Sequence, residues 1–338
     1  MSGEREAVEA RDLITLEAIR AAAETLRGIA VRTPLVAFGN PAERRLLKAE
    51  SLQPIGAFKI RGAYVAVGSL TPAERARGVI TYSSGNHAQG VARAARLLGA
   101  PAVVVMPSDA PTIKRERVAA DGAEIVVVGT ASDERRRVAE SLAAERGLSI
   151  IPPYDDDRII AGQGTIGLEL VDDLPDLAVV LVPIGGGGLA SGVATAIKAL
   201  RPGTRVIGVE PELAADAQES LTRGEIVRWP AELVSRTIAD GTRTQALGKR
   251  TFVHLRAHLD GVVTVSEAEI AGAVRLAAER TRLVVEPSGA LSLAAMAFHG
   301  GELGLAGLAG SVVAIISGGN VDPERYRELL RSPIPAEG

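Results

Sequence analysis

Short valine-rich runs alternate with helical stretches through much of this 338-residue chain. The runs between positions 78 and 151 lack polar alternation, which is typical of strands that are buried on both faces. The pattern predicts an α/β fold with a parallel sheet that helices cover on both faces. In this region the expected strands are 79–82, 102–106, 124–128 and 148–151, and the expected helices are 87–98, 112–121 and 132–146.

The same alternation divides the chain into two expected domains. A small mobile domain at 76–152 is inserted in a large domain formed by 1–75 and 153–338. In the large domain we expect a helix around 167–173. The polar, poorly periodic stretch 211–248 is expected to form flexible or binding loops.

Charge and composition exclude several kinds of partner. The net charge is −3 and the basic residues are scattered among 41 acidic ones, so we expect no nucleic acid partner. The chain has no cysteine, which excludes disulfides, thiolate zinc sites and thiol nucleophiles. The N-terminus is too charged for a secretory signal and no apolar run could span a membrane, so we expect a cytoplasmic protein. His254 and His258 share a helix face that we expect to be solvated rather than metal-binding.

Four consecutive glycines, Gly185 to Gly188, follow the apolar run 177–182 and precede a helix-like stretch at 189–200. Glycines there can turn successive backbone N–H groups toward one anion, and the helix N-terminus adds partial positive charge. The spacing is not the G-x-G-x-x-G of dinucleotide sites, and no G-K-[ST] follows as in nucleoside-triphosphate loops. The loop therefore favours a small phosphorylated cofactor. The alternative is a tight turn that binds nothing.

Polar clusters stand where predicted strands end. They are Ser83 to His87, the glycine loop, Glu210, and Ser317 to Asn320. Ligands of open α/β sheets lie at the carboxyl ends of the strands, so we expect these four loops to line one cleft.

Lys59 is one of only five lysines in a chain that otherwise uses arginine, and apolar residues flank it. A lysine can lose its proton when buried, whereas an arginine stays charged. A neutralisable amine and a phosphate loop together suggest pyridoxal phosphate held as a Schiff base. The alternative is a surface lysine, as we expect for Lys114, Lys198 and Lys249.

The segment 82–89, Y-S-S-G-N-H-A-Q, follows a strand and opens a helix. Its hydroxyls, amide and exposed helix N–H groups suit a substrate carboxylate. Ordinary helix capping by Ser84 or Asn86 is the alternative. Ser317 ends the last strand, where its hydroxyl can bond a heterocyclic nitrogen or cap a turn.

Eight motifs, spread over nearly the whole chain, resemble those of the fold type II pyridoxal-phosphate enzymes. Their order matches the branch that contains the threonine/serine dehydratases and serine racemases. The related cysteine synthases have a different lysine motif and a threonine in the phosphate loop. The motifs are A-F-K-I-R-G-A (57–63), S-S-G-N-H-A-Q-G (83–90), A-G-Q-G-T (161–165), G-G-G-G-L-A-S-G (185–192), V-E-P (209–211), I-A-D-G (238–241), E-P-S-G-A (286–290) and S-G-G-N (317–320).

The resemblance implies a tryptophan synthase β-like fold with two open, twisted, mostly parallel sheets covered by helices. It also implies a role for each motif residue. Lys59 would form the Schiff base and remove the substrate α-proton, and Ser84 would be a second acid/base in a racemase. The carboxylate of the substrate would be bound by Ser83, Ser84, Gly85, Asn86 and His87. The cofactor in the large domain would contact Phe58, Lys59, Asn86, Gly185, Gly186, Gly187, Gly188, Glu286 and Ser317, with Asn86 at the ring hydroxyl and Ser317 at the pyridine nitrogen.

The implied activity is that of an ammonia-lyase, which converts L-threonine, L-serine or a related β-hydroxy amino acid to the 2-oxo acid and ammonia. A neutral serine at the pyridine nitrogen disfavours a long-lived carbanion and favours prompt loss of the β-hydroxyl. Serine racemase with an eliminating side activity is the alternative. The segment P-P-Y-D-D at 152–156 looks more like that of the dehydratases. A third possibility is a silent binding protein that retains the fold, and Lys59 argues against it.

The resemblance also implies a divalent-cation site and an assembly. Glu210, Ala214 and Asp216 match a Mg²⁺ or Ca²⁺ site found in part of the family, and hard oxygen ligands suit these ions. A solvated acidic loop is the alternative. A homodimer is expected from the family alone.

Overall fold

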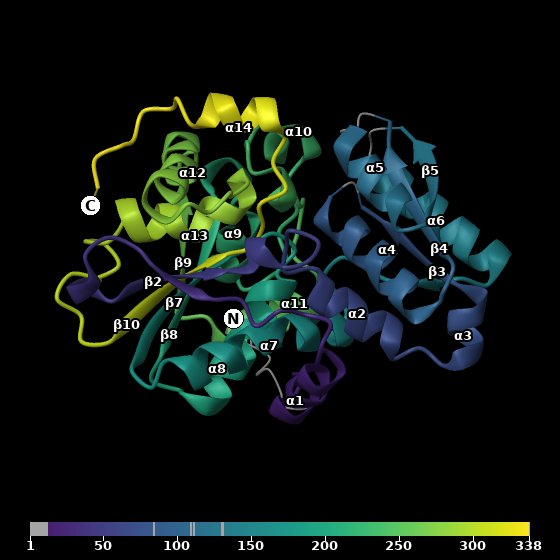
Figure 1. Cartoon of the computed structure of the whole chain (residues 1–338), viewed down its shortest axis with the longest axis horizontal. Helices are drawn as coiled ribbons and strands as arrows, with labels where there is room; N and C mark the ends of the chain where they lie inside the picture. Colours follow the sequence, from purple (N-terminus) through teal and green to yellow (C-terminus); the bar gives the residue numbers. More distant parts are fainter. Residues whose placement is uncertain (1–12, 84, 109, 111, 130–131, 338) are drawn as a thin grey trace, which may run out of the picture.

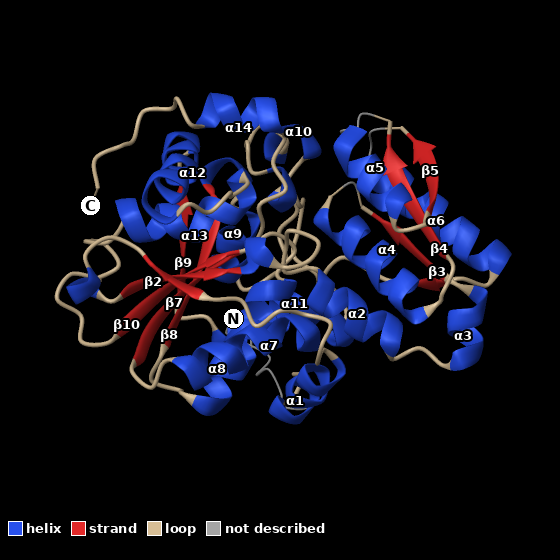
Figure 2. Cartoon of the chain, viewed as in Figure 1, coloured by secondary structure: helices blue, strands red, loops and turns tan. Residues whose placement is uncertain are grey.

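Two separate sheets organise the chain, and helices cover both (Figures 1 and 2). The computed structural model describes residues 13–83, 85–108, 110, 112–129 and 132–337. The six-stranded sheet has the order β1-β2-β10-β7-β8-β9, and the four-stranded sheet has the order β5-β4-β3-β6. The strands of the large sheet are β1 (Leu35–Ala37), β2 (Arg45–Ala49), β10 (Ser311–Ile316), β7 (Leu177–Pro183), β8 (Arg205–Pro211) and β9 (Gly261–Val265).

The large sheet is parallel except at one edge, where β1 pairs antiparallel with β2. Its central strands are buried on both faces: Val312 and Ala314 of β10 belong to one core, and Val313 and Ile315 belong to the other. The first core is completed by α12 (Glu267–Thr281) and α13 (Pro287–Phe298), and the second by α7 (Asp157–Asp173), α8 (Gly188–Leu200) and α11 (Lys249–His258).

The small sheet is entirely parallel. It is made of β3 (Val79–Tyr82), β4 (Ala102–Pro107), β5 (Glu124–Val128) and β6 (Ser149–Ile150). The helices α4 (Asn86–Leu98) and α5 (Thr112–Ala120) pack on one face, and α6 (Ser132–Arg146) packs on the other. The predicted α/β class with two mostly parallel sheets is therefore confirmed. The domain boundaries at 76 and 152 stay a prediction.

The remaining helical elements are α1 (Leu16–Thr25), α2 (Ile60–Gly68), α3 (Pro72–Arg77), α9 (Asp216–Arg223), α10 (Ala231–Val234), α14 (Pro323–Leu329) and the short 3₁₀ turns η2 (Pro41–Glu43), η3 (Glu50–Leu52), η4 (Glu212–Ala214) and η5 (Asp240–Thr242). No helix within these described residues is both long and apolar enough to span a membrane. The stretch 211–248 contains η4, α9, α10 and η5 between its loops, so it is partly helical.

The helix predicted around 167–173 begins ten residues earlier, at Asp157 of α7. The Asp156 carboxylate caps it by accepting a hydrogen bond from the Arg158 amide (2.8 Å). The glycines that obscured the helical pattern allow close packing: a Cβ on Gly162 would lie 2.6 Å from the Gly62 Cα of α2. Glycine here serves helix contact rather than a break.

Two other expectations were wrong. His254 is buried rather than solvated, because its Nε2 accepts a hydrogen bond from the Ile14 amide (2.9 Å) and its Nδ1 donates to the Arg250 carbonyl (2.7 Å). Lys114 is also buried, where its ammonium contacts an Asp240 carboxylate oxygen at 2.6 Å. Each group finds a partner from a distant part of the chain, which local sequence pattern does not reveal.

Candidate active site

Lys59 stands directly before α2, at the junction of the two sheets. Its position is tied to the end of β10, because the Phe58 amide donates to the Ser317 carbonyl (3.0 Å) and Ala57 pairs with Gly318. The Lys59 ammonium donates to the Pro153 carbonyl at 2.7 Å and lies 5.2 Å from the centre of the Phe58 ring. Burial lowers the pKa of Lys59 from 10.5 to about 8. A neutral amine is therefore accessible near physiological pH, as a general base requires.

The glycine loop lies between β7 and α8, and each of its positions is crowded. An added Cβ would lie 3.2 Å from the Thr242 Cα at Gly185 and 2.2 Å from the Tyr154 ring at Gly186. At Gly187 (φ +94°) it would lie 2.8 Å from the Thr251 Cβ, and at Gly188 3.1 Å from Tyr154.

These contacts explain why the four positions are glycine. Only residues without a Cβ leave room for backbone amides to face a ligand here, next to the N-terminus of α8. The loop is held from outside by the Thr251 hydroxyl, which donates to the Gly186 carbonyl at 2.7 Å. The residues that are present therefore fit a phosphate group. Tyr154, Thr242 and Thr251, which enclose the loop, were not singled out from the sequence.

The segment 83–87 leads into α4. The Gly85 amide donates to the Ser83 hydroxyl at 3.3 Å, and the Asn86 side chain does not cap the helix. Instead the Asn86 amide nitrogen donates to Glu286 (2.5 Å), and its oxygen accepts from the Asn320 amide (2.8 Å). Among the described residues, the first turn of α4 therefore has no side-chain cap, and its N–H groups are suited to an anion. Ser84 lies outside the described residues.

His87 is buried beside the catalytic lysine candidate. Its Nε2 lies 3.0 Å from the Ile151 carbonyl, which can only accept, so Nε2 carries the proton. The Nδ1 atom is buried and has no hydrogen-bond partner among the described residues. Burial and then the positive charge of Lys59 lower the pKa of His87 to about 3, so this imidazole is neutral.

Glu286 and Ser317 approach the same region from the start of α13 and the end of β10. Glu286 is buried, and burial followed by the nearby Asp240 charge raises its pKa to about 7. The Ser317 hydroxyl is 3.4 Å from the Ser288 carbonyl, and the Ser288 hydroxyl accepts from the Gly241 amide (2.8 Å) beside Thr242. These contacts link the ends of β3, β7 and β10, so three of the four predicted loops converge.

A model of the pyridoxal-phosphate dependent enzyme family matches residues 26–318. This chain belongs to that family. The predicted cofactor is therefore pyridoxal phosphate, as the loop and the lysine suggested.

Relatives of this pyridoxal-phosphate dependent enzyme are ammonia-lyases and racemases. It is 45% identical to the L-threo-3-hydroxyaspartate ammonia-lyase of Saccharomyces cerevisiae over 84% of this chain and 85% of the relative. It is 43% identical to the L-threonine ammonia-lyase of Geobacter sulfurreducens over 95% of this chain and 79% of the relative. Among solved structures, maize serine racemase superposes with a TM-score of 0.87 at 36% identity, covering 93% of this chain and 96% of the other.

The fourth predicted loop follows β8 and adjoins the glycine loop, because the Ile184 amide donates to the Val209 carbonyl (2.9 Å), and it contains two buried acids. The Glu210 carboxylate accepts from the Ala217 (3.0 Å) and Gln218 (2.8 Å) amides at the start of α9. Both Asp216 oxygens are buried and have no hydrogen-bond partner among the described residues. Burial raises the pKa of Asp216 to about 7, and burial and the Asp216 charge raise that of Glu210. No cluster of three or more His, Asp or Glu side chains suited to a metal occurs in the described chain, so a cation here needs a backbone oxygen such as that of Ala214.

Proposed function

We propose that this enzyme is an ammonia-lyase that converts a β-hydroxy amino acid to the 2-oxo acid and ammonia. The observation that supports it most is the desolvated amine of Lys59, positioned by the ends of β10 and the 153–157 segment beside the glycine loop. A lysine that loses its proton near physiological pH can remove the α-proton of an amino acid. Pyridoxal phosphate, when bound, supplies the electron sink that stabilises the resulting negative charge.

The surrounding residues have assigned parts in this proposal. The segment Ser83 to His87 binds the substrate carboxylate through the N-terminus of α4. The cofactor is held by Phe58, Asn86, Gly185 to Gly188, Glu286 and Ser317. The Ser317 hydroxyl is neutral, so it does not keep a ring nitrogen protonated as a carboxylate would. The α-proton passes to Lys59, whose ammonium then has a proton to return as the Cβ–O bond breaks and the β-hydroxyl leaves as water. Water hydrolyses the resulting enamine to the 2-oxo acid and ammonia.

Lysine labelling tests the central assignment. Borohydride reduction of the holoenzyme, followed by peptide mapping, should place the cofactor on Lys59. Lys48 is the internal control, because it is fully buried but its ammonium is paired with Glu169 at 2.6 Å. Label on Lys48 or any other lysine, or no bound cofactor, would contradict the proposal.

The substrate is proposed to be L-threonine, L-serine or L-threo-3-hydroxyaspartate. These share the α-amino acid head, and two of them appear in the names of the relatives above. A panel of β-hydroxy amino acids with detection of 2-oxo acids would rank them by kcat/KM. The absence of 2-oxo acid from every member would overturn the lyase assignment.

Serine racemase activity is the second candidate function, and the similarity to maize serine racemase favours it. It would use Ser84 as a second acid/base on the opposite face of the substrate. Chiral analysis of the amino acid that remains after reaction with L-serine separates the two functions. Abundant D-serine would favour the racemase, whereas pyruvate without D-serine would favour the lyase.

We further propose that Glu210, Asp216 and the Ala214 carbonyl bind Mg²⁺ or Ca²⁺. Two buried carboxylates repel each other, and the unpartnered Asp216 oxygens are suited to a hard cation. Either ion should raise the melting temperature of chelator-treated protein, and Asp216→Asn should abolish the increase. An equal increase in the variant would exclude this site.

A homodimer in the cytoplasm is also proposed. Three large apolar side chains are exposed close together: Val31 (46%), Leu52 (50%) and Val284 (50%). Val31 is bonded to Gln53 beside Leu52, and Gly319 packs between Ser51 and the Val284 carbonyl. Such a patch favours contact with a second copy. Light scattering should give a molar mass of two chains for wild type and of one chain for Leu52→Glu.

A further inference from the structure

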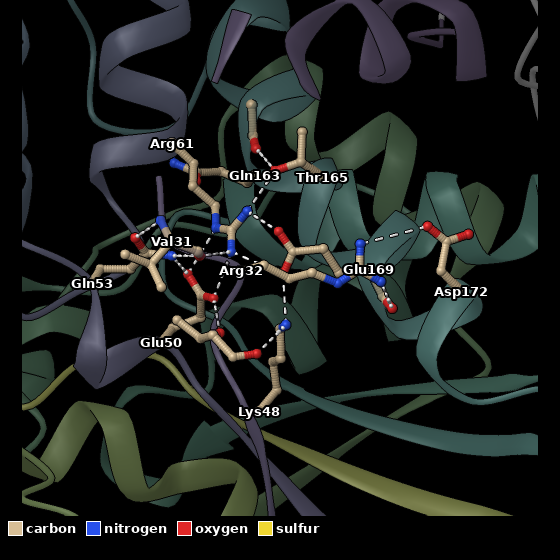
Figure 3. Close-up of polar contacts among 12 residues, drawn as sticks. Val31, Arg32, Lys48, Glu50, Gln53, Arg61, Gln163, Thr165, Glu169 and Asp172 are labelled. Atoms are coloured by element: carbon tan, nitrogen blue, oxygen red, sulfur yellow. Dashed lines mark hydrogen bonds and ion pairs between the residues drawn. The ribbon is translucent and has the colours of Figure 1, made fainter. Parts of the chain in front are cut away.

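Two cations and two carboxylates are buried together beneath the start of α2 (Figure 3). Lys48, Glu50 and Arg61 are each at most 1% exposed, and the Glu169 side chain is 13% exposed. They come from β2, η3, α2 and α7, so one group of charges joins four elements. We call these four residues the Arg61 cluster. Their charges cancel, as burial of ions requires.

Arg61 is the centre of this cluster. It binds Glu50 with two parallel bonds, Nε to Oε2 and Nη2 to Oε1, both 2.8 Å long. It also binds both Glu169 oxygens, from Nη1 at 2.6 Å and from Nη2 at 3.1 Å. Nη1 also reaches the Thr165 hydroxyl and Nη2 the Val31 carbonyl, each at 3.1 Å, so one Nη2 hydrogen is shared between two acceptors. Only a planar guanidinium offers this fork of donors; a lysine is a point charge.

The cluster bears directly on Lys59, which lies two residues before Arg61. No side chain caps the start of α2, and the Lys59 carbonyl accepts from the Ala63 amide (3.1 Å) in its first turn. Among the described contacts, the Arg61 side chain ties this turn to η3 and α7, helped by one bond from the Gly62 amide to the Gln163 side chain (3.3 Å).

The hydrogen-bond partner of the Lys59 ammonium is connected to the Arg61 cluster through α7. Pro153, whose carbonyl accepts from Lys59, lies in the segment that leads into α7, and α7 also carries Thr165 and Glu169. The Arg61 cluster thus sets the distance between the lysine and the segment that faces it. A small rotation of the first turn of α2 would move the amine at the end of the lysine side chain by a larger distance than the backbone.

We propose that Arg61 is a positioning residue for the reaction. Its ion pairs with Glu50 and Glu169 hold the first turn of α2 so that the Lys59 amine reaches the glycine loop and the substrate α-carbon. This inference rests on the proposed function of Lys59. A purely structural role would lower stability but leave the folded enzyme's lysine equally reactive.

The test compares Arg61→Lys with wild type as holoenzymes, at a temperature where both are fully folded. We expect kcat to fall about tenfold to hundredfold with KM changed much less, because misplacement of a reacting group by about 1 Å costs that much. We also expect slower and incomplete borohydride labelling of Lys59. Glu169→Gln, which keeps Arg61, should also lower kcat more than it changes KM, but by a smaller factor. This variant provides the test if Arg61→Lys does not fold.

The matched control is Lys198→Met. Lys198 forms a half-buried ion pair with Asp260 (2.7 Å) near the far end of α8, about 15 Å along the helix from the glycine loop. The Lys198→Met variant should have a lower melting temperature but the same kcat and the same borohydride labelling of Lys59. The inference is overturned if the Arg61 and Glu169 variants label Lys59 at the wild-type rate and lose no more kcat than the control. Failure of wild type itself to label at Lys59 would instead refute the proposed function.

Discussion

Replacing Lys59 by methionine should stabilise the cofactor-free protein near neutral pH. Burial lowers the pKa of this lysine from 10.5 to about 8, so the folded protein holds the charged amine at a cost. At about 1.4 kcal/mol for each pKa unit, the cost for a fully buried group would be about 3 to 4 kcal/mol. The side chain is only half-buried, and methionine loses the bond to the Pro153 carbonyl. We therefore expect a gain of about 1 to 3 kcal/mol in the free energy of unfolding.

The pH dependence of this gain identifies its cause. Below about pH 8 the lysine is charged in both the folded and the unfolded protein, so the whole penalty is present. Between about pH 8 and 10.5 the folded protein releases its proton first, and wild type gains stability relative to the variant. Above about pH 10.5 the amine is neutral in both states and the difference should vanish.

Urea unfolding of both cofactor-free proteins across this pH range measures the effect. Lys249→Met is the matched control. It removes an exposed lysine, which is not buried on folding, so we expect no gain in stability of this kind. The reasoning is refuted if Lys59→Met is no more stable than wild type near neutral pH. It is equally refuted if a gain persists unchanged above the ordinary lysine pKa.

Three further substitutions test other parts of the structure. Gly186→Ala should weaken pyridoxal-phosphate binding about tenfold or more, because the new Cβ would lie 2.2 Å from the Tyr154 ring; a fluorescence titration measures this, with Gly203→Ala, an open position, as control. Asp216→Asn should raise the melting temperature of metal-free protein above about pH 7, where the raised pKa leaves a buried charge, and have little effect below about pH 4; an equal shift at both pH values would argue against this. His254→Ala should lose about 1 to 3 kcal/mol in urea unfolding, because the Ile14 amide is left buried without an acceptor; a loss no larger than that of His258→Ala would contradict that account.

The candidate active site could be predicted from the sequence where its parts are local. The glycine loop follows a strand and opens a helix, so both its position and its backbone chemistry are readable. Lys59 was recognisable because lysine is rare in this chain. The meeting of the loops after β7 and β10 follows from parallel strand order, because these strands are neighbours in one sheet. The loop after β3 belongs to the other sheet, and its contact with them depends on how the two sheets pack.

What encloses the centre could not be predicted in the same way. Tyr154 and Thr251 approach the glycine loop from segments that have no periodic pattern in common with it. Glu50 and Glu169 are 119 positions apart and resemble ordinary surface acids, yet both are bound by Arg61. Such pairs are defined by tertiary packing, which a single sequence does not record. The early start of α7 was missed because glycines that permit helix contact look locally like helix breakers.

The amine of Lys59 rests on a main-chain oxygen and not on an acidic side chain. An ammonium paired with a carboxylate would resist giving up its proton, and any mutation of that acid would reset the balance. A carbonyl carries no net charge and persists whatever residue occupies the position. Substitutions in the segment 153–157 can therefore change its side chains while the partner of the Lys59 amine is preserved.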